Sequence, residues 1–130
     1  MSPRPTPRIR GSELEAVALQ YLTTQGLQML QRNFQCRLGE IDLIMRERDT
    51  LVFVEVRYRR SARYGGAAET VDWRKQRKLI RTAQVYLSMH CRHHSPPCRF
   101  DILGIAPGAG SAGYHFDWLP NAFGLSDRPY

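Results

Sequence analysis

The sequence has little cysteine and no long apolar run. Its three cysteines, Cys36, Cys91 and Cys98, are an odd and scattered set, which fits a reducing compartment better than a disulfide framework. Because no stretch approaches the roughly 18 consecutive apolar residues that a spanning helix needs, we expect no membrane segment. Residues 1–11 are rich in proline and arginine and lack the apolar centre of a secretory signal. Together these absences lead us to expect a cytoplasmic protein.

The length and composition indicate one globular domain. A chain of 130 residues has the size of a single domain. A domain of this size buries about two-thirds of its surface on folding, so it needs no metal or disulfide to fold. The apolar fraction of 42% excludes a disordered chain. We expect a flexible basic tail over residues 1–11, a single domain over residues 12–123 and a C-terminal tail over residues 124–130.

Positive charge is concentrated in one segment of the chain. Between Arg57 and Arg81 stand nine basic residues against Glu69 and Asp72, a surplus as large as the net charge of +7 of the whole chain. A solvated helix face and loop is the simpler explanation. The concentration nevertheless favours a polyanionic partner, and we expect nucleic acid, most naturally DNA. The candidate nucleic-acid-binding residues are Arg59, Arg60, Arg74, Lys75, Arg77 and Lys78.

Apolar periodicity and turn residues predict the order α-β-β-β-α-β-β. A first helix is expected over Ser12–Gln25, and a second helix follows the N-cap Asp72. This order implies an α/β fold in which a mixed central sheet is flanked by helices. The predicted strands are Leu27–Phe34, Gly39–Met45, Leu51–Tyr58, Phe100–Ile105 and Tyr114–Leu119.

Two carboxylates, Asp42 and Glu55, interrupt otherwise apolar strands. Burying a carboxylate without compensation costs free energy, so each needs a partner. If the hairpin turn is centred between Arg48 and Asp49, Asp42 lies opposite Glu55 with the two Cβ atoms about 4.5–5.5 Å apart. Two like charges at that separation repel unless a cation lies between them or one is protonated. Mg²⁺, or Mn²⁺ in its place, is the expected cation, because hard divalent ions prefer carboxylate oxygens.

The same face of the sheet carries a third candidate, Arg57, because side chains alternate along a strand and Glu55 is two residues away. These groups suit hydrolysis of a phosphodiester: a metal would polarise the phosphate and lower the pKa of an attacking water. Arg57 would stabilise charge on the phosphate, but it is a poor general base because its guanidinium stays protonated.

Structural roles for these residues are the alternative. The predicted register also places Glu40 opposite Arg57, so Arg57 can be a simple ion-pair partner. Glu15 follows Ser12 with the spacing of a capping box and can serve only its own helix. Asp42 and Glu55 can likewise belong to a structural network with arginines.

A second cluster, C-x-H-H-x₃-C between Cys91 and Cys98, contains residue types that bind zinc. Structural zinc sites usually use two separated ligand pairs, so we favour an ordinary surface loop here.

Several short motifs are spread over residues 11–123. They are Gly11-x-x-x-Glu15-x-x-Ala18, Asn33, Gly39-Glu-Ile-Asp-Leu-Ile44, Val52-Phe-Val-Glu-Val-Arg-Tyr-Arg-Arg60, Lys75-Gln-Arg-Lys-Leu79 with Ala83, and Arg99-Phe-Asp101. Together they resemble the motifs of the YraN family, small bacterial proteins related to restriction-endonuclease-like nucleases and archaeal Holliday-junction resolvases.

The resemblance implies a restriction-endonuclease-like mixed sheet and a site of the type D…(D/E)-x-K. By position, Asp42 and Glu55 are the metal carboxylates, and Arg57 occupies the lysine place. Glu15 is implied as an accessory acidic residue near the metal, and Lys75 as a contact to substrate phosphate. Arg57 departs from the pattern, because arginine keeps the charge but not the proton transfer of lysine.

Three functions follow as expectations. The first is a Mg²⁺-dependent endonuclease acting on structured or branched DNA. The second is a nucleic-acid-binding module with weak or absent catalysis, as Arg57 suggests. The third is a protein-interaction subunit that uses the aromatic strand Tyr114–Leu119 or the C-terminal tail. Junction resolvases act as dimers on two-fold substrates, so a homodimer is a further expectation.

Overall fold

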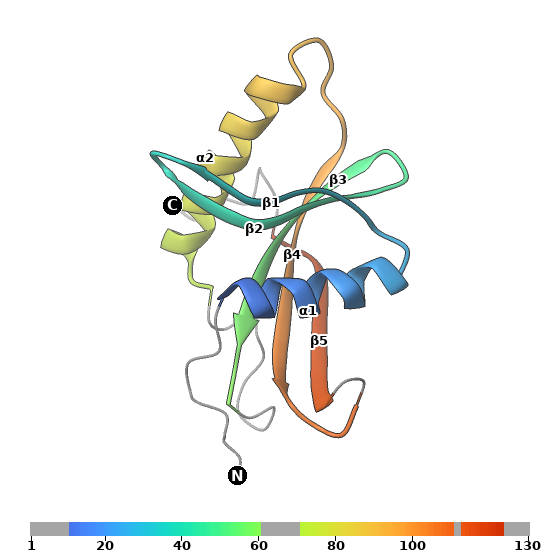
Figure 1. Cartoon of the computed structure of the whole chain (residues 1–130). Coiled ribbons are helices and arrows are strands. Elements are labelled where there is room, and N and C mark those ends of the chain that lie inside the picture. The colour runs from blue at the N-terminus through green and yellow to red at the C-terminus, as the bar shows by residue number, and fades with distance from the viewer. Residues whose placement is uncertain (1–10, 61–70, 111–112, 124–130) are drawn as a thin grey trace.

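The computed structural model describes residues 11–60, 71–110 and 113–123, and these form two helices and one five-stranded sheet (Figure 1). The order α-β-β-β-α-β-β and the α/β class with a mixed sheet are confirmed. Of the tail expected over residues 1–11, Gly11 belongs to the first helix, and residues 1–10 lie outside the described residues, as do residues 61–70 and the expected tail over residues 124–130. The elements are α1 (Gly11–Thr24), β1 (Gln28–Cys36), β2 (Gly39–Glu47), β3 (Thr50–Tyr58), α2 (Trp73–His90), β4 (Cys98–Pro107) and β5 (Tyr114–Phe123).

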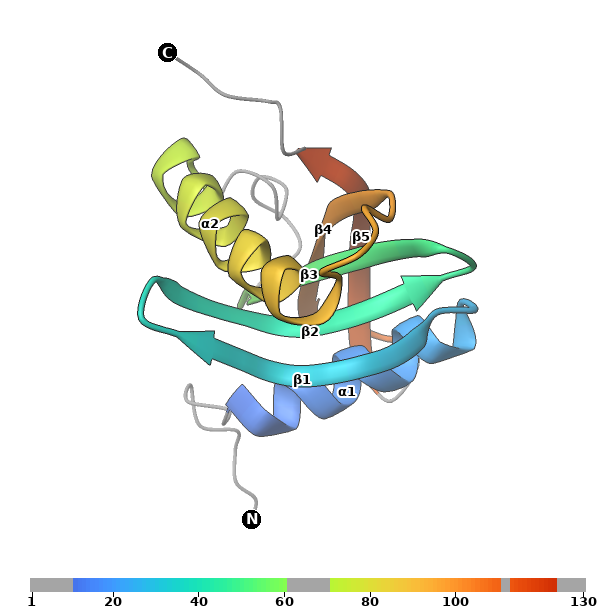
Figure 2. The same ribbon diagram turned by 90° about the horizontal axis from the view of Figure 1, so that it is seen from above.

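The five strands lie in the sheet in their chain order. All neighbours are antiparallel except β3 and β4, which are parallel and are connected through α2, as a parallel pair requires. The sheet is strongly twisted, so that β1 and β2 run across the direction of β4 and β5 in Figure 1. Figure 2 shows α2 on one face of the sheet and α1 on the other.

The central strand β3 contributes to the core on both faces, as its nearly continuous apolar sequence predicts. On the face covered by α2, the ring of Phe53 lies 5.2 Å from that of Phe100 and 6.0 Å from that of Tyr86, measured between centroids. On the face covered by α1, Ala18 and Leu22 are fully buried against the sheet. The buried residues of α2 are Leu79, Ile80, Thr82, Ala83 and Tyr86.

The aromatic residues of β5 pack inward. The ring of Tyr21 in α1 stacks on Phe116 with centroids 4.2 Å apart, and it meets the edge of Trp118 at 6.4 Å. Tyr114 also packs against this half of the core. These half-buried rings stabilise the contact of α1 with the sheet.

Asp101 is fully buried in β4 and has a complete set of partners. It accepts hydrogen bonds from Arg99 Nε at 3.0 Å, from Trp118 Nε1 at 2.9 Å and from the Asn121 backbone N–H at 2.9 Å. Arg99 also donates to Glu47 at 2.6 Å. A buried charge is tolerated when it is paired and hydrogen-bonded in this way, so the Arg99-Phe-Asp101 motif ties β4 to β5 and β2.

No helix in the described part of the chain combines the length and the apolar character needed to cross a lipid bilayer.

Candidate functional site

The β2–β3 hairpin has the predicted register. Its pairs run from Glu47↔Thr50 to Leu43↔Val54 around a turn at residues 48–49. Arg48 has a φ of +58° in this turn. Asp42 and Glu55 are the next residues on their strands: the regular ladder ends at Leu43↔Val54, and the same register continued by one pair sets them opposite each other. Both residues line the same pocket.

Beyond the pair Leu43↔Val54, a hydrogen bond from a side chain takes the place of backbone pairing between β2 and β3. Asp42 Oδ2 accepts the backbone N–H of Val56 at 2.8 Å. This bond fixes the Asp42 carboxylate beside the strand that carries Glu55. The two carboxylates therefore come together through the geometry of one hairpin.

The electrostatic environment of Asp42 is unfavourable to its negative charge. Burial is the main cause that raises its pKa, to about 7, and the charge of Glu55 is the second. Glu15 and Glu40 raise the pKa further, while the hydrogen bond from Val56 opposes the shift. A proton or a cation at Asp42 is thus stabilised by three neighbouring carboxylates.

Glu55 is buried and touches two cations. Its Oε2 lies 3.2 Å from Arg57 Nη1 and 3.3 Å from Lys75 Nζ. Arg57 reaches it along the same strand face, whereas Lys75 comes from the first turn of α2. The backbone N–H of Lys75 is capped by Asp72 Oδ1 at 3.0 Å, so the predicted N-cap is confirmed and holds this turn in place.

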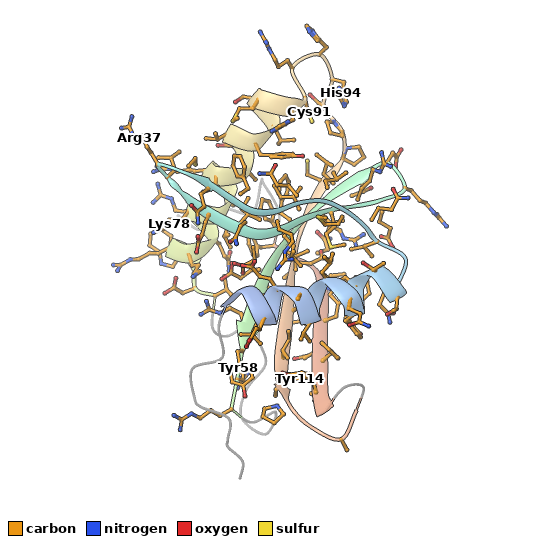
Figure 3. All side chains as sticks on the ribbon, viewed as in Figure 1. Arg37, Tyr58, Lys78, Cys91, His94 and Tyr114 are labelled. Atoms are coloured by element: carbon orange, nitrogen blue, oxygen red, sulfur yellow. The ribbon has the colours of Figure 1, made fainter. Side chains whose placement is uncertain are left out.

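A pocket of about 640 Å³ opens beside the carboxylate pair. One wall is acidic and belongs to β2 and β3, and the other is basic and belongs to the N-terminal half of α2. Figure 3 shows Lys78 on α2 beside the β1–β2 hairpin, whose tip carries Arg37. The lining residues are Gln35, Cys36, Gly39, Glu40, Asp42, Glu55, Arg74, Lys75, Lys78 and Leu79.

The β1–β2 hairpin closes this pocket by resting on α2 at Gly39. A Cβ atom at this position would lie 2.9 Å from Thr82 Oγ1, which is closer than real Cβ contacts allow. The side chain of Thr82 is held there by a hydrogen bond to the carbonyl of Lys78 at 2.8 Å. Glycine is therefore required for the close approach of hairpin and helix.

Glu15 lies outside the lining of this pocket, although its charge acts on Asp42. It is buried in α1, which begins at Gly11, so Ser12 stands inside the helix and not at the predicted N-cap. Glu15 Oε1 lies 3.9 Å from Arg32 Nη2 and has no hydrogen-bond partner within the described residues. Burial is the main cause that raises its pKa.

The structure divides the predicted nucleic-acid-binding residues among several places. Arg74, Lys75 and Lys78 line the pocket, whereas Arg77 does not and its guanidinium lies over the ring of Trp73, 5.5 Å from the ring centre. Arg59 lines a second, much smaller pocket together with His115 and Asp117. Arg60 is exposed just beyond the end of β3.

The donor set at Asp42 and Glu55 fits a hard divalent cation. Carboxylate oxygens are the ligands such ions prefer, and Mg²⁺ typically uses one or two of them and completes its shell with waters and substrate phosphates. The raised pKa of Asp42 shows that negative charge is incompletely compensated at this position.

Among the described residues, no three His, Cys, Asp or Glu side chains form a ready-made metal cluster. The segment that joins α2 to β4 lies within that part of the chain, and its Cys91 and Cys98 are free cysteines.

Two features of the site were not predicted from the sequence. One is the contact of Lys75 with Glu55, for which its position three residues after the N-cap is the available signal. The other is the part of β1 that lines the pocket, because Gln35 and Cys36 lie beyond the predicted end of that strand. Gln35 Nε2 donates to Glu40 Oε1 at 3.1 Å across the hairpin.

Similar proteins come from several bacteria. A UPF0102 protein of Stutzerimonas stutzeri is 53% identical over 114 residues, covering 87% of this chain and 92% of the relative. A UPF0102 protein of Alcanivorax borkumensis is 50% identical over 113 residues, covering 87% and 90%. The solved structure of an EndoMS–dsDNA2 complex has a TM-score of 0.38 and 17% identity, covers 77% of this chain and 38% of that one, and is too distant to carry an argument.

The profile of the Uncharacterised protein family UPF0102 matches residues 14–105, which contain all of the pocket and the carboxylate pair. The chain therefore belongs to the Uncharacterised protein family UPF0102, which is the YraN family that its motifs resemble.

Proposed function

We propose that this protein is a metal-dependent endonuclease that acts on structured or branched DNA. The observation that carries the proposal is the pocket itself, in which Asp42 and Glu55 face Arg74, Lys75 and Lys78. A phosphodiester needs a metal or cationic groups to offset its charge, and both kinds of group converge here. The family resemblance to nucleases points the same way.

Asp42 and Glu55 would hold Mg²⁺ or Mn²⁺, and a bound ion would supply polarisation of the scissile phosphate and acidification of a water. The chain itself supplies the remaining positive charge. Arg57 can donate to a phosphate oxygen as charge develops on it, and it is already oriented by its contact with Glu55. The first turn of α2 adds its own partial positive charge beside Arg74 and Lys75.

Lys75 adds a second positive group to the site. Its Nζ atom lies 3.3 Å from Glu55, and Lys75 lines the pocket. A charged ammonium group there can bind a phosphate oxygen. We therefore assign substrate-phosphate binding to Lys75 and charge stabilisation to Arg57.

One observation favours a second candidate, a nucleic-acid-binding module without efficient catalysis. Glu55 is paired with both Arg57 and Lys75, so its charge is compensated without a metal. Such a protein would bind DNA through the basic wall of the pocket and leave it uncut.

Cleavage assays on duplex, single-stranded and four-way-junction DNA with Mg²⁺ or Mn²⁺ test the proposal. We expect Asp42→Asn and Glu55→Gln to reduce cleavage by about a hundredfold or more, because each keeps the shape of the site but removes a metal ligand. Lys75→Met removes the charge and should reduce both cleavage and DNA binding. Lys75→Arg keeps the charge and should retain most of the DNA binding. Asp49→Asn, in the exposed hairpin turn, is the matched control and should cut normally.

Calorimetric titration with the metal separates the two candidates. Binding of Mg²⁺ or Mn²⁺ that disappears in Asp42→Asn supports the nuclease. DNA binding without metal binding supports the second candidate, and cleavage that survives both carboxylate substitutions would falsify the assignment of the site. The expected homodimer is measured separately by sedimentation.

A further inference from the structure

The exposed indole of Trp73 is left unexplained by the metal and phosphate roles. Trp73 begins α2, and 46% of its surface is accessible. Within the described residues it belongs to neither half of the apolar core. The accessible part of an indole offers a flat apolar face on which another ring can stack.

Arg77 holds this indole in place. Its guanidinium carbon lies 5.5 Å from the centre of the Trp73 ring, the distance of a cation–π contact. The two residues are four positions apart on one helix, a spacing at which side chains meet. The ring is thus a flat surface with a restricted orientation, which lowers the entropy cost of stacking a second ring on it.

The neighbours of Trp73 are suited to a nucleic-acid strand. The next two residues, Arg74 and Lys75, line the pocket that holds Asp42 and Glu55. Aromatic rings beside a basic groove are the combination by which proteins bind unpaired nucleotides, because every base has a face that can stack while the cations follow the phosphates. Bases inside a duplex are already stacked on each other and do not offer such a face.

We propose that Trp73 is a stacking platform for an unpaired nucleobase at the start of α2, where the basic residues of the pocket wall follow it in the chain. The inference rests on the proposed function for the class of ligand, and it deepens that function by naming a substrate with single-stranded nucleotides beside the site. A merely structural pair, in which Arg77 and Trp73 stabilise the first turn of α2, is the competing explanation.

Binding measurements without divalent metal test the proposal, so that no cleavage is needed. Fluorescently labelled oligothymidine and a blunt duplex of equal length are titrated with wild type, Trp73→Ala and Trp73→Phe at low salt. We expect Trp73→Ala to weaken oligothymidine binding by about tenfold and duplex binding by less than about twofold. Trp73→Phe should retain most of the affinity, because phenylalanine still offers a ring.

Intrinsic fluorescence gives an independent signal. The chain has two tryptophans, and Trp118 is half-buried and donates to Asp101 on the other face of the sheet. Oligothymidine should therefore quench the fluorescence of wild type and leave that of Trp73→Phe nearly unchanged. Met89→Ala is the matched control, because Met89 is also a large exposed apolar residue of α2 but lies near its other end.

The outcomes distinguish this proposal from the nuclease assignment. Equal loss of single-strand and duplex binding in Trp73→Ala, or no loss in either, overturns the stacking role even if wild type cuts DNA in a metal-dependent way. Selective loss of single-strand binding together with quenching supports stacking even if no cleavage is found. Quenching that persists in Trp73→Phe also overturns it.

Discussion

At the scale of single residues, Asp42 and Asp101 show how differently two carboxylates of one sheet are treated. Asp101 is fully buried and is satisfied by Arg99, Trp118 and the backbone of Asn121. Asp42 receives one backbone hydrogen bond and faces the negative charge of Glu55. The hydrogen bonds and ion pair of Asp101 stabilise the fold. The negative charge of Asp42 is electrostatically unfavourable in the folded protein, and binding a proton or a cation there removes the unfavourable energy.

This cost predicts how stability depends on pH. The pKa of Asp42 is about 7 in the folded protein, against about 4 in an unfolded chain, so the folded state holds its proton over this range. Stability from this group is present at low pH and is lost as the pH rises through about 7. We expect Asp42→Asn to be more stable than wild type at about pH 8, by on the order of 2 kcal/mol.

Urea denaturation in EDTA at both ends of this range measures the effect. The two proteins should converge as the pH is lowered below about 4, because the carboxyl then becomes neutral in both states. Asp49→Asn serves as the control in the exposed turn. An Asp42→Asn variant that is less stable than wild type at the higher pH contradicts the electrostatic account.

At the scale of elements, the pocket exists because the β1–β2 hairpin and α2 meet closely. The N-cap Asp72 fixes where α2 begins, and Gly39 lets the hairpin rest on Thr82. The acidic wall and the basic wall belong to different elements, so their separation depends on this contact. A disturbance at Gly39 therefore changes both stability and the geometry of the site.

Gly39→Ala should lower the free energy of unfolding by about 1–3 kcal/mol, because the added methyl collides with Thr82 Oγ1. Removing that hydroxyl with Thr82→Ala should recover part of the loss, so the double variant will be more stable than additivity predicts. Chemical denaturation of the four proteins of this cycle measures the coupling.

Gly26→Ala is the control for backbone strain alone. Gly26 has a φ of +102°, and nothing lies within 4 Å of the position that a Cβ atom would take there, so Thr82→Ala should not rescue it. Equal rescue of both glycine variants would show that the contact between hairpin and helix is not the cause.

At the scale of the whole molecule, charge is distributed unevenly over the surface. The segment from Arg57 to Arg81 carries a surplus of positive charge equal to the chain's net +7, and the structure places its described helical part along one wall of the pocket. A polyanion bound there would release counterions in proportion to the phosphates that the wall contacts. Residues with the same charge elsewhere should contribute little to this release.

Lys78→Ala should reduce the slope of log affinity for DNA against log salt by about one. Arg92→Ala removes the same charge beyond the C-terminal end of α2, where its side chain is exposed, and should leave the slope nearly unchanged. Binding isotherms at several salt concentrations give the slopes. Equal reductions in both variants would indicate a response to net charge and not to this wall.

Local rules made much of the site predictable. The alternation of side chains and the turn at residues 48–49 set the hairpin register, and the register brought Asp42 opposite Glu55. The N-cap role of Asp72 was also predictable, because capping acts within a single helical turn. The ends of strands were harder to predict. β1 continues to Cys36 and β5 to Phe123, because pairing with a neighbouring strand keeps polar residues in the extended conformation where an isolated strand would end.

The sequence by itself determined the order of the elements, the facing carboxylates and the basic segment, because these follow from interactions between residues close in the chain. Only the tertiary structure decided that Lys75 contacts Glu55, that Gly39 rests on Thr82 and that Arg59 lies in another pocket. Those contacts depend on how α2, which connects β3 to β4, packs on the sheet. The physical reason is that packing between distant segments sets the position of whole elements, and side-chain alternation alone does not.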